Sequence, residues 1–256
     1  MNHQPYPILE FDPANEAIIE PSRVLKPIDI ASHCVVCFFQ DVIKDLAASG
    51  RAHEVTKSVS EMGDHPIYEL EWQGQRVAFF HPGVGAPLAA GIFEEVIARG
   101  CRKFIACGGC GVLDREIAVG HLLIPTSAVR DEGTSYHYLP PGREVSASPA
   151  GVAAIEKVLA RRGVGYLLTK TWTTDGLYRE TVEKTLLRKK EGCLAVEMEA
   201  AAFFAVAQFR GVAFAQILYG GDAVIPGGWD SRDWVSRGSV RQQLFWLSVE
   251  ACLEMA

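Results

Sequence analysis

The amino-acid sequence predicts a single-domain α/β fold, in which a central mixed β-sheet is flanked by helices. Short apolar runs of strand length alternate with longer windows whose apolar residues recur at helical spacing. Glycines follow several of the apolar runs, at the strand ends where α/β folds gather their ligands. Neither a repeat nor a low-complexity tract interrupts this pattern, so we expect one domain over residues 1–256.

The elements are predicted in chain order from these patterns. Residues 34–38 are the first strand, and a helix over 41–48 follows with apolar positions at helical spacing. Residues 77–80 are the second strand. The helix after it covers about 87–99, because a proline opens it and a glycine stands just past its end.

The third predicted strand, 103–107, runs into a glycine-rich loop at 108–111. Residues 127–147 contain two prolines and few helix signals, and predict a long surface excursion. The remaining strands are predicted at 121–125, 166–171 and 212–219, and the remaining helices at 149–162, 179–190, 197–209 and 240–254.

Charge and composition exclude several classes of protein. Twenty-five Lys and Arg residues against 31 Asp and Glu residues give a net charge of −6, which does not fit a general nucleic-acid binder. No window approaches 18 uninterrupted apolar residues, and the N-terminus lacks the pattern of a signal peptide. The seven cysteines are scattered and odd in number, which is typical of a reducing compartment. We therefore expect a cytoplasmic protein that binds neither nucleic acid nor membrane.

Two C-x-x-C spacings, Cys34–Cys37 and Cys107–Cys110, raise the question of a zinc site. The first pair lies in a predicted strand, where residues three apart point to opposite faces and cannot easily hold one ion. We expect buried, structural cysteines and no metal.

The run Val196-Glu197-Met198-Glu199-Ala200-Ala201 carries the strongest chemical signal. Two carboxylates adjoin an apolar helix, and buried carboxylates are costly without partners. They could serve a site, or they could complement the positive end of the helix dipole. The residues alone leave both readings open.

This run resembles the nucleoside phosphorylase and nucleosidase superfamily, which includes uridine phosphorylase and hexameric purine nucleoside phosphorylase. Other landmarks follow in the same order. The runs at 83–87 and 107–111 resemble its two glycine loops, 130–135 is similar to uridine-phosphorylase-like members, and Asp222 lies 23 residues after Glu199. The resemblance covers roughly 33–225 and leaves 1–32 as an N-terminal extension.

The resemblance implies cleavage of a nucleoside N-glycosidic bond and a role for each matched residue. Glu199 would bind the ribose hydroxyls and Met198 would pack against the sugar, which assists an oxocarbenium-like transition state. Asp222 would be the general acid that protonates the departing base, although an aspartate here could also be an ordinary loop residue. Further substrate contacts are expected from Glu197, Gly85, Gly108, Gly109 and Arg130.

The base pocket is expected near 173–178. Leu177 stands where the family has a stacking aromatic residue, so Tyr178 or Trp172 would stack instead. The glutamine and arginine that read a pyrimidine in uridine phosphorylases are replaced by Thr181 and Glu183, which favours a purine-like base. The aromatic C-terminal stretch would cover this pocket or lie at an interface; its members are Trp229, Trp234, Phe245 and Trp246.

The phosphate site departs from the family pattern. No arginine occurs at 39–43, where the family has one, Ala106 stands at the second arginine position, and Gly109 replaces a hydroxyl residue. Anion binding depends strongly on such arginines. Phosphorolysis could persist with a site rebuilt from Lys44, Arg130 or a neighbouring subunit.

Two other outcomes are open. Water could replace phosphate in a hydrolytic nucleosidase, with Asp41 near the position of the water-activating glutamate, although Asp41 also suits a helix start. The chain could also be a nucleoside-binding relative without turnover. The resemblance further implies a homo-oligomer, a dimer or a hexamer, and no cofactor beyond phosphate as a possible co-substrate.

Overall fold

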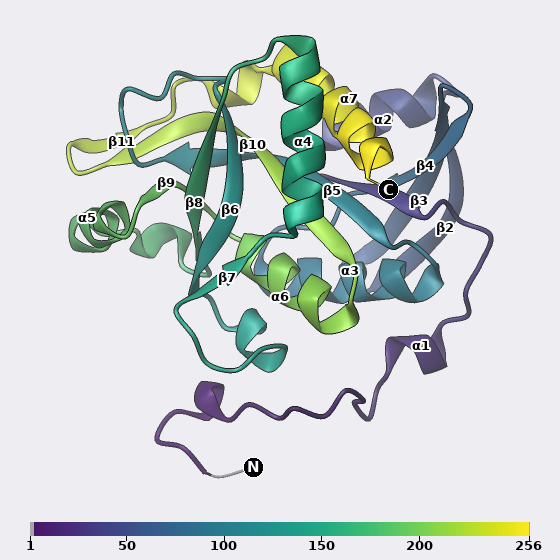
Figure 1. Cartoon of the computed structure of the whole chain (residues 1–256), viewed down its shortest axis with the longest axis horizontal. Helices are drawn as coiled ribbons and strands as arrows, with labels where there is room; N and C mark the ends of the chain where they lie inside the picture. Colours follow the sequence, from purple (N-terminus) through teal and green to yellow (C-terminus); the bar gives the residue numbers. More distant parts are fainter. Residues whose placement is uncertain (1–2, 256) are drawn as a thin grey trace.

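The computed structural model describes residues 3–255 and shows an α/β architecture (Figure 1). Its strands form one mixed sheet. They are β1 (His33–Cys37), β2 (His53–Ser60), β3 (Gly63–Trp72), β4 (Gln75–Phe80), β5 (Lys103–Val112), β6 (Leu122–Asp131), β7 (Glu144–Ser146), β8 (Tyr166–Thr174), β9 (Cys193–Glu197), β10 (Ala213–Ile225) and β11 (Gly228–Asp230). The α-helices are α1 (Pro21–Val24), α2 (Gln40–Ala48), α3 (Ala86–Arg99), α4 (Pro149–Arg162), α5 (Val182–Lys190), α6 (Ala200–Arg210) and α7 (Gly238–Glu254). The short 3-10 helices are η1 (Pro7–Leu9), η2 (Thr134–His137), η3 (Leu177–Arg179) and η4 (Trp234–Ser236).

The sheet closes on itself along part of its length. Strand β10 pairs in parallel with β5 and antiparallel with β6, so β10, β6, β8, β9 and β5 form a closed ring. From β5 the sheet continues outward through β1, β4, β3 and β2 as an open wing. Because β1, β4, β5 and β10 run parallel, their carboxyl ends lie at one edge, where such folds place a site.

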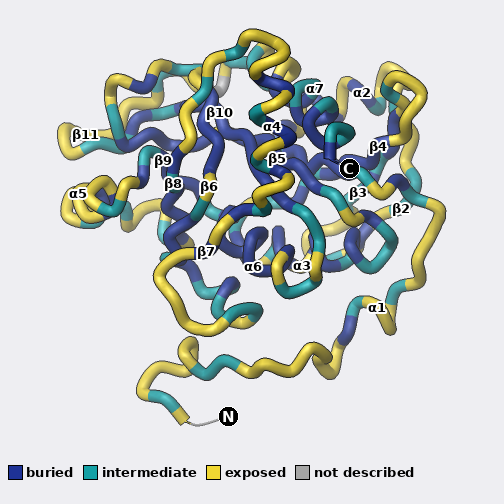
Figure 2. Tube along the Cα trace, in the orientation of Figure 1, coloured by how far each residue is buried: buried dark blue, intermediate teal, exposed yellow. Residues whose placement is uncertain are grey.

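Helices cover both faces of the sheet and bury two apolar cores. Helices α3 and α6 pack on one face, where the rings of Phe93, Phe203 and Phe214 have centroids 4.9–5.4 Å apart. Helices α2, α4 and α7 pack on the other face. Figure 2 shows the central strands buried between these layers. Cys34 belongs to the first core and Cys37 to the second, so strand alternation separates this pair as expected.

Residues 3–32 run along the outside of the molecule with little regular structure (Figure 1). Buried Glu20 fastens this segment, because Arg210 of α6 forms ion pairs with Glu20 at 2.9 Å and Glu94 at 2.6 Å. Within residues 3–255, no helix is both long and apolar enough to cross a bilayer.

The α/β fold with a central mixed sheet is confirmed, but several predicted details are wrong. The β2–β3 hairpin was not predicted, because only one residue of β2 is buried and the strand lacks apolar alternation. The predicted excursion at 127–147 begins as a strand, since β6 continues to Asp131 and pairs with β7. The predicted loop at 108–111 is likewise strand, because β5 continues through these glycines beside β10.

Candidate active site

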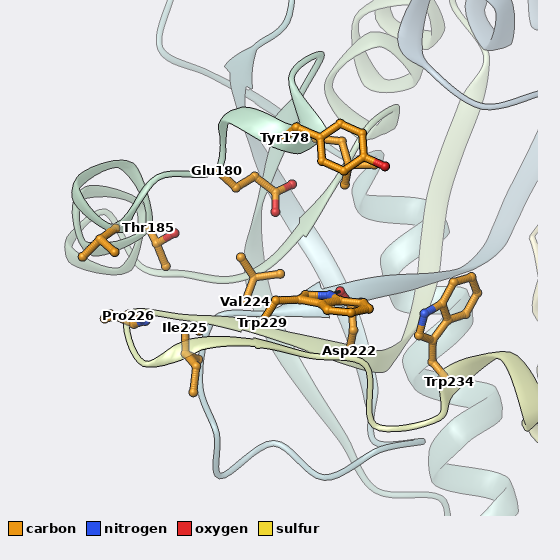
Figure 3. A pocket seen from close by; sticks show the side chains of 12 residues that line it. Tyr178, Glu180, Thr185, Asp222, Val224, Ile225, Pro226, Trp229 and Trp234 are labelled. Atoms are coloured by element: carbon orange, nitrogen blue, oxygen red, sulfur yellow. Dashed lines mark hydrogen bonds between the residues drawn. The ribbon is translucent and has the colours of Figure 1, made fainter.

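Two adjoining cavities lie at the carboxyl edge of the sheet. The inner cavity has a volume of about 720 Å³, the outer cavity about 740 Å³, and both are lined by Leu177, Asp222 and Trp234. The inner cavity is further lined by Phe38–Asp41, Lys44, Val84, Gly108–Gly111, Val196–Glu199, Gln216, Tyr219, Gly221 and Arg241. The outer cavity (Figure 3) is further lined by Tyr178, Glu180, Val182, Thr185, Val224–Pro226, Gly228 and Trp229.

Glu197 ends β9 and is buried, yet its carboxylate has partners. It accepts hydrogen bonds from the Thr173 hydroxyl at 2.6 Å and from the backbone N–H groups of Glu199 at 2.7 Å and Ala200 at 2.6 Å. Burial raises the pKa of Glu197. Because this carboxylate binds N–H groups at the start of α6, the helix begins at Ala200 and not at 197 as predicted. Glu197 therefore positions its neighbours as well as lining the inner cavity.

Glu199 lies at the N-cap of α6 and lines the inner cavity beside Met198. One carboxylate oxygen accepts a hydrogen bond from the Gly85 N–H at 2.6 Å. Gly85 has a φ of +94°, a conformation that favours glycine, so the first glycine segment is shaped to deliver this N–H. Burial and the nearby Glu197 charge raise the pKa of Glu199 to about 8.

Asp222 lies in β10 at an irregularity in the pairing with β5, where both cavities meet. One carboxylate oxygen accepts a hydrogen bond from the Trp229 indole N–H at 2.7 Å. The β10–β11 hairpin brings Trp229 back over Asp222, since Val224 pairs with Trp229 across the turn. The Asp222 carboxylate is thus oriented by one donor while it faces the ligand space.

The aromatic side chains of the outer cavity differ in part from those expected. Tyr178 and Leu177 line it, but Trp172 is fully buried and donates its indole N–H to Asp131 at 3.0 Å, so it cannot stack on a base. Trp229 and Trp234 supply aromatic surface instead (Figure 3). The other two aromatic residues of the C-terminal stretch pack inside: Phe245 against Phe79 and Trp246 against Trp72.

Arg241 is the side chain that sequence reasoning missed. It comes from α7 and lines the inner cavity, where its guanidinium lies over the rings of Phe39 and Trp234. It forms ion pairs with Asp41 at 3.4 Å, and no described residue accepts a hydrogen bond from its buried Nε. Lys44 also lines this cavity, whereas the expected arginine positions remain empty. Only tertiary structure brings Arg241 beside a residue 200 positions away.

The remaining predicted residues fall at different places. Gly108 and Gly109 line the inner cavity, and a Cβ at Gly109 would approach the Tyr219 ring at 3.2 Å. Arg130 does not line either cavity; its guanidinium donates to the Ser135 hydroxyl at 2.9 Å and to the carbonyl of Pro140 at 2.8 Å. Among the residues that the structure describes, no group of three or more His, Cys, Asp or Glu side chains could hold a metal ion.

Comparisons with known proteins show which family this chain is similar to. Residues 32–241 match the phosphorylase superfamily. A guanosine phosphorylase of Halorubrum lacusprofundi is 30% identical over 158 residues, an alignment that covers 60% of this chain and 64% of that protein, slightly under two thirds. A DeoD-type purine nucleoside phosphorylase of Caldanaerobacter subterraneus subsp. tengcongensis is 29% identical over 192 residues, which covers 72% of this chain and 78% of that protein.

Solved structures share the fold. The crystal structure of purine nucleoside phosphorylase from Toxoplasma gondii in complex with immucillin-H superimposes with a TM-score of 0.75 at 20% sequence identity. The superposition covers 88% of this chain and 92% of that chain. At this identity the likeness establishes the arrangement of strands and helices.

Proposed function

The chain belongs to the phosphorylase superfamily, and on that premise we propose that it cleaves the N-glycosidic bond of a purine nucleoside, with phosphate accepting the sugar. The observation that carries this proposal is the placement of Glu199 and Met198 in the inner cavity, with Asp222 at its junction with the outer cavity. A nucleoside has the same bipartite shape: a sugar in one compartment, a base in the next, and the scissile bond at the junction.

The sugar is held by Glu199 in this mechanism. Its free carboxylate oxygen accepts hydrogen bonds from the ribose hydroxyls, while the Gly85 N–H fixes the other oxygen. As the C1′–N9 bond lengthens, positive charge develops on the sugar ring, and a nearby carboxylate stabilises that charge more than it stabilises the ground state. The Met198 side chain supplies apolar contact beside the sugar.

The departing base takes the electron pair of the broken bond, and Asp222 donates a proton to its N7 nitrogen so that it leaves neutral. The Trp229 indole bond holds one Asp222 oxygen, which keeps the other directed toward the ligand. An oxygen of phosphate then bonds to C1′ and gives sugar 1-phosphate. The proton that the attacking hydrogen phosphate loses returns to Asp222, so atoms and charges balance without a further reactant.

The residues at the two positions that contact the pyrimidine in uridine phosphorylases, Thr181 and Glu183, favour a purine base. The Thr181 hydroxyl accepts the Lys184 N–H as the N-cap of α5. Glu183 is exposed and lines neither cavity. Neither side chain therefore presents the donors and acceptors that a uracil edge requires. The names of the guanosine and purine nucleoside phosphorylase relatives point the same way.

Arg241 and Lys44 support phosphate as the acceptor. Both are cationic and line the inner cavity on the α2 and α7 side. Arg241 has an unpartnered Nε, a contact of 3.4 Å to Asp41 and cation–π contacts with Phe39 and Trp234, so its guanidinium keeps a donor for a dianion. A C-terminal arginine would thus replace the two missing from the expected positions.

Hydrolysis is the second candidate, and one observation favours it. Asp41 lines the inner cavity and forms an ion pair with Arg241. Its carboxylate could therefore activate a water molecule, and its charge would offset the arginine charge that phosphate binding needs. The third alternative is a protein that binds a nucleoside and does not cleave it.

A nucleoside panel assayed with and without phosphate separates these outcomes. We expect sugar 1-phosphate and free purine only when phosphate is present. Free ribose without phosphate would identify a hydrolase, and binding without products would identify a non-catalytic relative. Asp222→Asn should lower kcat about 100-fold or more, because the base must then leave as an anion. Near-wild-type rates for Asp222→Asn and Glu199→Gln would refute the proposed site.

We also propose a cytoplasmic homo-oligomer. Met62 and Val84 expose apolar side chains around a hollow that adjoins the Gly85 segment, which suits a subunit contact beside the site. Sedimentation of Met62→Glu against wild type tests this surface, since the charge should lower the oligomeric mass, and an unchanged mass would exclude it.

A further inference from the structure

We propose that the outer cavity holds, beyond the base, an apolar substituent on the 6-amino nitrogen of a purine nucleoside, such as a branched five-carbon group or a benzyl group. This inference rests on the proposed function and names a substrate class for the same site. It concerns the part of the outer cavity between α5 and the β10–β11 hairpin, which we call the distal pocket. Its lining residues are Val182, Thr185, Val224, Ile225 and Pro226.

The outer cavity is larger than a purine base. Its volume is about 740 Å³, whereas a purine occupies roughly 150 Å³, the space of about five water molecules. The inner cavity, with its own volume of about 720 Å³, accommodates the sugar and phosphate. A base beside Asp222 and Trp234, where the two cavities meet, therefore leaves the distal pocket for another group. Figure 3 shows Thr185 and Pro226 on the side of the outer cavity opposite Trp234.

The strand that carries Asp222 leads into the distal pocket. Asp222 lines both cavities, whereas Val224 and Pro226, farther along the chain, line the outer cavity alone. Side chains two apart on a strand point to the same face, so Val224 follows Asp222 along the cavity wall at a distance of about 7 Å. When N7 of the base faces Asp222, the 6-position is next to N7 on the same edge and lies farther from the sugar. A substituent at that position is therefore directed past Val224 toward Pro226.

The distal pocket favours an apolar substituent. Apart from the Thr185 hydroxyl, the side chains that line it are hydrocarbon. Val182 is 49% exposed and Ile225 is half-buried, so an apolar group would remove both from water. The described lining residues of the whole outer cavity include no Lys, Arg or His, so an anionic substituent would lack a counter-charge. Burial, more than the Asp222 charge, raises the pKa of Glu180 in the same cavity to about 7, which agrees with apolar surroundings.

A series of substituted nucleosides tests this pocket at saturating phosphate. We expect kcat/KM for N6-(3-methylbutyl)adenosine and N6-benzyladenosine to exceed that for adenosine by about 10-fold or more, because even partial burial of five to seven carbons supplies this factor. An N6-(3-carboxypropyl) group of similar length should give no gain, because the pocket offers its charge no cation. The 3-methylbutyl group on the 2-amino nitrogen of guanosine should give none either, because that nitrogen lies on the edge of the base away from N7. Equal or lower kcat/KM for the two apolar derivatives, or an equal gain for either control compound, would overturn the proposal.

Val182→Asp introduces a charge into the distal pocket. Val182 is the first residue of α5, a position where an acidic side chain is compatible with the helix. We expect the ratio of kcat/KM for N6-(3-methylbutyl)adenosine to that for adenosine to fall about 10-fold or more. Leu187→Asp is the matched control, because Leu187 lies on the same helix, is 46% exposed and lines neither cavity. Its ratio should stay at the wild-type value, and equal ratios in the two variants would contradict the placement of the substituent.

Binding of free adenine and of 6-(3-methylbutylamino)purine, measured by calorimetry on the full-length wild type and both variants, separates this inference from the proposed function. A wild type that cleaves purine nucleosides without a gain from the apolar substituent would overturn the role of the distal pocket alone. Absence of turnover, with tighter binding of the alkylated base that weakens only in Val182→Asp, would overturn the catalytic proposal alone. Absence of turnover without this preference in binding would overturn both.

Discussion

Replacing Glu199 with glutamine should stabilise the protein at neutral pH while it removes activity. The buried carboxyl group has a pKa of about 8 in the folded chain, against 4.5 as its ordinary value. Such a group stays protonated in the folded state over a range where the unfolded chain has already released the proton. The unfolded state is therefore favoured progressively as pH rises from about 4.5 to about 8.

The size of this stability loss follows from the pH range between the two pKa values. Each pH unit within it contributes about 1.4 kcal/mol, so wild type loses about 3 kcal/mol of its free energy of unfolding by pH 7. Glutamine cannot ionise, and its amide oxygen can still accept the Gly85 N–H. We expect the variant to be more stable than wild type by about 3 kcal/mol at pH 7 and by less than about 1 kcal/mol at pH 5. At pH 7 this is a gain in Tm of roughly 6–12 °C for a chain of this size.

Thermal unfolding of Glu199→Gln and wild type from pH 5 to 9 measures this difference. Glu183→Gln is the control, because its exposed side chain should leave the pH dependence unchanged. A Tm difference that does not grow with pH, or a less stable variant at pH 7, would refute the reasoning. At pH 9, where the wild-type carboxyl group is ionised, the same samples should show kcat/KM reduced about 100-fold or more, since the ribose hydroxyls lose a charged acceptor.

Further predictions follow from other contacts. Arg241→Met should lower kcat/KM for phosphate about 10-fold or more, and an unchanged phosphate titration would exclude this arginine from the anion site. The kcat/KM for a purine nucleoside should rise between pH 7 and 9, as Glu199 ionises with a pKa of about 8; a rate that falls over this range would contradict its role as the acceptor for the ribose hydroxyls. Arg210→Met should destabilise the fold by about 3–5 kcal/mol, because it leaves Glu20 and Glu94 buried without a cation, whereas Arg161→Met on the exposed face should cost less than about 1 kcal/mol in the same denaturant titration; equal losses would contradict this. Gly111→Ala should lower Tm, since its Cβ would come within 2.9 Å of Val196 and Val224, and an unaltered Tm would show that these side chains move aside.

Local patterns predicted the elements that bury a periodic apolar face. Helix α3 starts and stops where its proline and glycine indicated, and β1 and β4 are continuous apolar runs because both of their faces are covered. The β2 strand shows no such pattern, since its stability comes from pairing with β3 along a mostly exposed surface. The start of α6 depends on the buried Glu197 carboxylate, a tertiary contact that no propensity encodes.

Some residues of the candidate site could likewise be predicted from the sequence, and others could not. Glu199 and Asp222 could be predicted from the sequence, because the Glu-Met-Glu run and the distance along the chain from Glu199 to Asp222 resemble those of the family. Arg241 could not, because α7 brings it to Asp41 across the whole chain.

The two tryptophans of the outer cavity give the protein an optical signal of its own. Trp229 is 67% exposed and donates to Asp222, and Trp234 lies at the junction of both cavities, whereas Trp172 is fully buried and Trp72 stacks on Trp246. A base that enters between them would displace water from these two indoles and leave the other three unchanged. Intrinsic fluorescence should therefore follow occupancy of the base compartment in real time, without a label and before any bond is broken.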